Sequence, residues 1–108
     1  MTLDSCIRVS RRDNHTLVTL HGEIDLSADH AFDRVLDVVT AWAEPVDVDL
    51  SDVTFFSAAG AAFLVRLASV VGPERVTIVG TCPSVELVLE VCGLQLPHAG
   101  GGGPPTPL

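Results

Sequence analysis

The residues whose types suggest chemistry gather where an expected strand gives way to an expected helix. Residues 46–50 alternate between apolar and polar side chains, and from Ala58 apolar residues recur every three or four positions. Ser57 stands between them, where its hydroxyl can accept a hydrogen bond from a free backbone N–H of the first helical turn. Because a helix N-terminus carries partial positive charge, this junction is a candidate binding or phosphorylation site. In the simpler alternative, Ser57 only caps the helix and Gly60 only allows close packing.

Two carboxylates form a second candidate. Glu23 and Asp25 alternate at the end of another expected strand, a spacing that could serve general acid–base catalysis. A solvated loop rim explains the same pair more simply, so we do not expect an active site there.

Other signatures of catalysis and ligand binding are absent from the sequence. The chain contains no P-loop, no dinucleotide-binding glycine motif, no nucleophile elbow and no zinc-protease motif. No metal-ligand spacing joins the histidines and cysteines, which are His15, His21, His30, His98, Cys6, Cys82 and Cys92. We therefore expect a protein that is not an enzyme and that binds neither a metal nor a cofactor.

Length and charge narrow the class further. A chain of 108 residues indicates one domain, and a net charge of −8 without any lysine argues against binding to nucleic-acid phosphates. No apolar run approaches the ~20 residues of a membrane-spanning helix, and the first residues do not resemble a signal peptide. We therefore expect a cytoplasmic protein with no membrane span, no nucleic-acid partner and reduced, mostly buried thiols.

Strands and helices that would position these residues alternate along the chain. The expected strands cover residues 6–11, 17–22, 46–50 and 76–79, with a short last strand around Leu94 and Leu96, and the expected helices cover residues 28–43, 58–71 and 83–92. Asp13-Asn14 marks a hairpin turn between the first two strands, Ser27 is the expected N-cap of the first helix, and a short loop is expected over residues 52–56.

This alternation predicts an α/β fold in a single domain. The sheet should have four to five strands, mostly parallel and with an N-terminal antiparallel hairpin, and three helices should pack on it. The strand at residues 46–50 should be central. Residues 97–108, PHAGGGGPPTPL, cannot bury apolar surface, so we expect a flexible Gly/Pro-rich tail after a folded domain of residues 1–96.

Three stretches resemble the STAS domain family, and most closely the small bacterial anti-sigma-factor antagonists. They are DLSDVTFFSAAGAAFL at residues 49–64, TCPSVELVLEVCGL at residues 81–94 and GEID at residues 22–25. The resemblance covers residues 6–96 and implies a STAS-like fold. It also implies a protein that binds an anti-sigma factor of the serine-kinase-like class and so releases a sigma factor, a transcription regulator.

The resemblance further implies where the partner binds. In such antagonists a serine at the mouth of the second helix is phosphorylated, and the added charge of about −1.5 to −2 ends the interaction. The implied contact residues in this chain are Glu23, Asp25, Phe56, Ser57, Ala58, Ala59, Gly60 and Ala62.

This sequence departs from the family pattern at the switch itself. The serine that is phosphorylated in the family aligns with Ala58, and the acidic residue before it aligns with Ser57. Ala58 has no hydroxyl group, so we expect no phosphorylation at that position. Ser57, one residue away, is a candidate substitute acceptor. The last helix of the family is replaced by the Gly/Pro tail.

Two other functions remain open at this stage. One is a STAS-like subunit of a lipid-transport ABC system, in which a similar loop docks on an ATPase. The other is a STAS module that binds a small ligand or a nucleotide. Co-purification would separate the three, because each predicts a different companion: an anti-sigma factor, an ATPase or a retained nucleotide.

Overall fold

One five-stranded sheet forms the centre of the structure, a computed structural model that describes residues 2–4 and 6–98. Its strands lie side by side in chain order and are β1 (Thr2–Asp4), β2 (Ile7–Arg12), β3 (His15–Ile24), β4 (Val46–Phe56) and β5 (Val76–Gly80). β1, β2 and β3 pair antiparallel, and β3, β4 and β5 are parallel. Asp13 and Asn14 form the β2–β3 turn with φ of 54° and 65°, a left-handed conformation that tight hairpins require.

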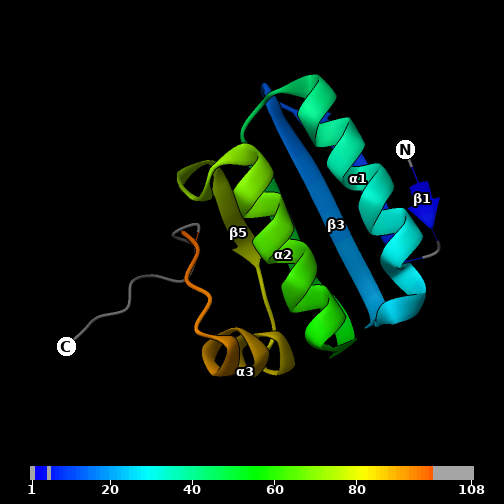
Figure 1. Ribbon diagram of the computed structural model, residues 1–108, viewed down its shortest axis with the longest axis vertical. Helices are drawn as coiled ribbons and strands as arrows, with labels where there is room; N and C mark the ends of the chain where they lie inside the picture. Colours follow the sequence, from blue (N-terminus) through cyan, green and yellow to red (C-terminus); the bar gives the residue numbers. More distant parts are fainter. Residues whose placement is uncertain (1, 5, 99–108) are drawn as a thin grey trace.

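Three helices follow the parallel strands. They are α1 (Asp29–Trp42), α2 (Ala58–Val71) and α3 (Pro83–Cys92), with short 3-10 turns at η1 (Leu26–Ala28) and η2 (Pro73–Arg75). α1 and α2 lie side by side across one face of the sheet, and α3 lies at the end where α2 begins (Figure 1). The predicted α/β fold, with its N-terminal hairpin and three helices, is confirmed. Among the described residues, no helix has the length and apolar character to cross a membrane.

The hydrophobic core lies between the sheet and these two helices. Val48 and Leu50 of β4 are fully buried, as are Phe32 of α1 and Phe63 of α2. The two phenyl rings stack with their centroids 4.3 Å apart, which joins the helices above the sheet. β4 lies between β3 and β5, so the strand expected to be central is indeed an interior strand.

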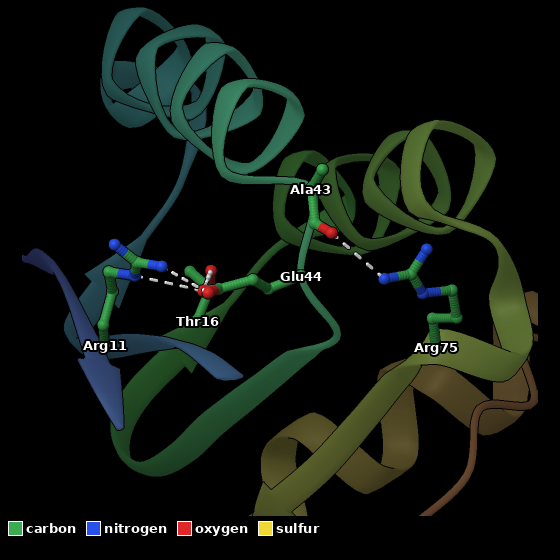
Figure 2. Close-up of polar contacts among 5 residues, drawn as sticks. All are labelled: Arg11, Thr16, Ala43, Glu44 and Arg75. Atoms are coloured by element: carbon green, nitrogen blue, oxygen red, sulfur yellow. Dashed lines mark hydrogen bonds and ion pairs between the residues drawn. The ribbon is translucent and has the colours of Figure 1, made fainter. Parts of the chain in front are cut away.

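Polar side-chain contacts join neighbouring segments at the end of the sheet where the parallel strands begin (Figure 2). The Arg11 guanidinium binds both carboxylate oxygens of Glu44, with its Nε 3.2 Å from Oε1, and this hydrogen bonding lowers the pKa of Glu44. Arg75 Nη2 donates to the Ala43 carbonyl oxygen at 3.3 Å. These contacts tie the turn between α1 and β4 to β2 on one side and to η2 on the other.

β4 is longer than the sequence indicated. The loop predicted over residues 52–56 is wrong, because these residues continue β4 beside β3, with Gly22 opposite Val53 and Glu23 opposite Phe55. One step along β3 therefore matches two steps along β4, which makes a β-bulge at Thr54. A second register shift lies between Asp49 and Asp52. Together the two shifts break the alternation of buried and exposed residues, so a two-residue period does not mark residues 51–56 as part of the strand.

The start of α1 also differs from the prediction. Ser27 does not cap α1: it lies inside η1, whose N-cap is Asp25, and α1 begins after Ala28 with no side-chain cap. The predicted thiol burial holds only in part, because Cys92 is exposed while Cys6 and Cys82 are half-buried.

The end of the described chain holds one more correction. No strand forms at Leu94 and Leu96. Instead, Ile78 of β5 donates its N–H to the Pro97 carbonyl at 2.7 Å and forms an isolated parallel bridge with His98. Of the tail predicted over residues 97–108, residues 99–108 lie outside the described part of the chain.

Candidate functional site

The carboxyl ends of β3 and β4 meet beside the first turn of α2. The Ser57 N–H donates to the Ile24 carbonyl at 3.0 Å, which holds the ends of the two strands together. A shallow, open hollow of about 640 Å³ lies here, lined by Asp25, Leu26, Ser27, Ser57, Ala58 and Ala59. The two segments that the sequence singled out separately, around Asp25 and around Ser57, therefore form one site.

Ser57 acts as the predicted N-cap of α2. It has extended backbone angles, and its Oγ accepts a hydrogen bond from the Ala59 N–H at 3.2 Å. Its carbonyl accepts from Gly60 N at 3.0 Å and from Ala61 N at 3.3 Å. The hydroxyl is half-buried and already engaged, so its first role in the molecule is structural.

Asp25 is held in one orientation by the serine two residues later. Its Oδ1 accepts from Ser27 N at 2.9 Å and from Ser27 Oγ at 2.6 Å. These two bonds lower the pKa of Asp25, so the carboxylate is ionised at neutral pH. Its second oxygen makes no hydrogen bond or ion pair with any residue that the structure describes.

The last two residues of β4 are phenylalanines that point to opposite sides of the strand. Phe56 is only 4% exposed and points into the core, whereas Phe55 is 52% exposed. Leu26, in η1, is 75% exposed. An apolar side chain at such exposure adds little to folding, so Leu26 and Phe55 are surface residues available for contact.

The predicted contact residues separate into two groups. Asp25, Ser57, Ala58 and Ala59 line the hollow, Glu23 is exposed on β3 opposite Phe55, and Ala62 is exposed one helical turn beyond Ala58. Phe56 and Gly60, by contrast, are buried.

Phe56 and Gly60 form a support beneath this surface. A Cβ atom at Gly60 would lie 2.5 Å from Cε1 of the Phe56 ring, so glycine is what lets the ring pass under α2. Both residues are buried, so neither presents side-chain surface to a partner.

Sequence reasoning missed the two apolar residues most exposed at this site. Phe55 was missed because residues 52–56 were expected to form a loop, whereas they continue β4 and place Phe55 and Phe56 on opposite sides of the strand. Leu26 had no distinguishing signal, because the same tripeptide, Asp-Leu-Ser, at residues 49–51 places its leucine in the core.

The chemistry that the site offers is that of a contact surface. Ser27 is hydrogen-bonded to a carboxylate, but no histidine takes part in that pair, and Ser57 is bonded only to backbone. In the described part of the chain, no group of three or more His, Cys, Asp or Glu side chains could hold a metal ion. What remains is a small-residue helix mouth, two exposed apolar side chains and an oriented carboxylate.

Comparison with known proteins places this geometry among related folds. The family model described as "Mlab, STAS domain" matches residues 7–96. The crystal structure of an anti-sigma factor antagonist from Mycobacterium paratuberculosis matches with a TM-score of 0.75 and 26% identity, covering 85% of this chain and 82% of that one. A search of curated proteins finds no significant match.

Two more distant structures share the fold. The anti-sigma factor antagonist SpoIIAA in its unphosphorylated form matches with a TM-score of 0.68 at 10% identity, covering 86% of each chain. An uncharacterised protein with a SpoIIAA-like fold from Shewanella loihica matches with a TM-score of 0.52 at 15% identity, covering 85% of this chain and 79% of that one.

Proposed function

The chain belongs to the STAS domain family, and on that premise we propose that it is an anti-sigma-factor antagonist, a non-catalytic protein that acts in the cytoplasm. It binds an anti-sigma factor of the serine-kinase-like class and so frees a sigma factor. Residues 1–96 constitute the domain that does so. The observation that carries the proposal is the similarity over 85% of the chain to an antagonist of known structure.

The contact surface lies at the mouth of α2. It comprises Leu26, Phe55, Ala58, Ala59 and Ala62, with Glu23 and Asp25 beside them. Small side chains at the first turn of α2 let a partner approach the helix closely, and Leu26 and Phe55 supply apolar area that the fold itself does not use.

Regulation differs from the family pattern at this surface. Ala58 is exposed at the position of the family's phosphorylated serine but has no hydroxyl to accept a phosphoryl group. Ser57 would have to give up its bond to the Ala59 N–H before it could be modified. We therefore propose that the antagonist stays competent for binding in the presence of ATP and the partner kinase.

Titration calorimetry against anti-sigma factors from the same genome tests the proposal, with Ala58→Glu as the informative variant. Negative charge in the first turn of a helix favours the helix dipole, so this variant should fold normally. It should still bind about ten- to a hundred-fold more weakly, because it places a charge in a small apolar contact. Ser69→Glu, exposed at the other end of α2, is the matched control and should bind as the wild type does.

Three outcomes would change the proposal. If wild type and Ala58→Glu bind equally, the mouth of α2 is not the interface. Phosphate found on Ser57, with binding lost in step, would show that the switch has moved by one residue. Absence of binding to every anti-sigma factor tested would refute the proposed partner class.

A second candidate function is favoured by one finding. The matched family model carries the description Mlab rather than that of an antagonist. A STAS-like subunit of a lipid-transport ABC system would present the same surface to an ATPase and would need no phosphorylation switch, in agreement with Ala58. Co-purification of an ATPase in place of an anti-sigma factor would decide for this alternative.

A further inference from the structure

The charges that border the hollow all have one sign. The chain segments that supply its lining residues, residues 22–31 and 52–65, contain four carboxylates but no lysine or arginine. These carboxylates belong to Glu23, Asp25, Asp29 and Asp52. The segments that supply the lining are therefore acidic, in a chain whose net charge is −8.

The arginine that follows these segments is already engaged. Nη2 of Arg66 in α2 lies 2.5 Å from Asp33 Oδ1, and its Nη1 lies 3.9 Å from Asp29 Oδ1. Its charge is therefore paired with two carboxylates of α1. Glu23 and Asp25 have no cationic partner among the described residues. Their charges are balanced only by solvent until something else approaches.

Asp25 is prepared to receive a cation. Both hydrogen bonds from Ser27 fall on Oδ1, which fixes the carboxylate plane and leaves Oδ2 without a protein partner in the described chain. Leu26, the next residue, projects apolar surface beside it and is 75% exposed. An ionised, oriented carboxylate with one open oxygen is a good acceptor for a guanidinium or ammonium group.

We propose that this hollow accepts a partner-protein segment in which a large apolar side chain is flanked by Arg or Lys. The apolar side chain enters the hollow against Leu26 and Ala58, and the cation binds the open oxygen of Asp25. This proposal rests on the proposed function, since it names the chemistry of the partner's docking face. A basic protein surface is the expected occupant because its positive charge complements the carboxylates near the hollow. The same complementarity raises the rate of association.

Three short peptides with the same apolar centre test the proposal by NMR. Acetylated Arg-Leu-Phe-Arg, Gln-Leu-Phe-Gln and Glu-Leu-Phe-Glu amides are titrated into the ¹⁵N-labelled full chain at low salt. The arginine peptide should shift the backbone amide signals of Leu26, Ser27, Ala58 and Ala59. It should bind roughly tenfold more tightly than the glutamate peptide, with a difference that shrinks as salt is added.

Asp25→Asn and Asp49→Asn form a matched pair of variants. Each removes one unit of charge from an Asp-Leu-Ser segment and keeps the oxygen that accepts from the serine N–H, but of the two only Asp25 lines the hollow. Asp25→Asn should remove most of the preference for the arginine peptide, and Asp49→Asn should keep it.

Each contrary result is decisive and is separable from the proposed function. Equal binding of the arginine and glutamate peptides, shifts that map away from the hollow, no shift at all up to several millimolar peptide, or equal effects of the two variants would each overturn the inference. The proposed function is tested separately with intact anti-sigma factors. A protein that binds one of them but shows no preference for basic peptides would keep its function and lose this account of the docking face.

Discussion

The tripeptide Asp-Leu-Ser occurs twice in this chain, at residues 25–27 and 49–51, and its two copies have opposite fates. In both, the aspartate Oδ1 accepts from the serine N–H and from the serine Oγ, at 2.9 and 2.6 Å in the first copy and at 3.0 and 2.6 Å in the second. The leucine between them is 75% exposed in the first copy and 0% exposed in the second.

Neighbouring elements, not the local sequence, produce this difference. Leu50 lies in β4 between two paired strands and faces α1 and α2, so burial is imposed by the sheet. Leu26 lies two residues after Ile24, the last residue of β3, and is the first residue of η1. The same local hydrogen bonds are therefore compatible with a core residue and with a surface residue. A leucine left outside the core in this way is available to bind another molecule.

The largest effect expected from this comparison is on stability. Leu50→Ala should lower the free energy of unfolding by about 3 kcal/mol, within the usual 2–5 kcal/mol for a fully buried leucine, because it removes apolar contacts and leaves a cavity. Leu26→Ala should change it by less than about 0.5 kcal/mol, as most exposed substitutions do. Urea unfolding followed by circular dichroism measures both. Similar losses in the two variants would mean that Leu26 is part of the folded core.

Sequence reasoning recovered the elements whose pattern is regular. α2 and α3 begin and end where they were expected. Apolar residues recur at helical spacing in both, Ser57 marks the start of α2, and Pro83 and Gly93 mark the start and the end of α3. The continuation of β4 was lost because a bulge depends on the register with β3, which no single segment encodes. β1 is three residues long, too short for any period to be read.

The candidate site was predictable in position but not in its surface. Ser57 and Ala58 were found from helix-start chemistry and from family resemblance. Asp25 lies beside them because β3 and β4 are parallel and end at the same edge of the sheet. The exposure of Leu26 and Phe55 follows from where β3 ends and from how far β4 continues, and both depend on how the two strands pair.

The second expected effect is on binding rather than on stability, and it falls on Leu26 rather than on Leu50. Leu26→Ala, which should leave stability unchanged, should weaken binding to the cognate anti-sigma factor about tenfold, or ~1.4 kcal/mol, as loss of an apolar interface contact commonly does. Calorimetric titration with the partner measures it. Val91 of α3 is exposed to about the same extent as Leu26, so Val91→Ala is the matched control and should bind as the wild type does. An affinity unchanged by Leu26→Ala would remove Leu26 from the interface.

A smaller effect is expected at the buried support of the site. Gly60→Ala should lower the free energy of unfolding by about 1 kcal/mol, because the new methyl group overlaps the Phe56 ring and alanine's higher helix propensity offsets only part of that cost. Thermal and urea unfolding measure the change. In a Phe56→Leu background the same substitution should cost less. A cost that is equal in both backgrounds would place the strain elsewhere.

The smallest effect concerns the charge of Asp25. Hydrogen bonds from the Ser27 side chain and backbone hold the pKa of this carboxyl below its ordinary value of 3.8. Because the folded pKa is lower than the unfolded one, these bonds stabilise the folded chain above pH 3.8, and their contribution is lost as the pH falls through the folded pKa.

The carboxyl ¹³C signal of Asp25 should therefore titrate with a midpoint below 3.8. Ser27→Ala, which removes the Oγ–H donor, should raise that midpoint toward 3.8. A wild-type midpoint at or above 3.8 would mean that Ser27 does not hold the carboxylate in solution. Asp25 would then be a freely rotating surface charge, and the resemblance between the two Asp-Leu-Ser segments would end at their sequence.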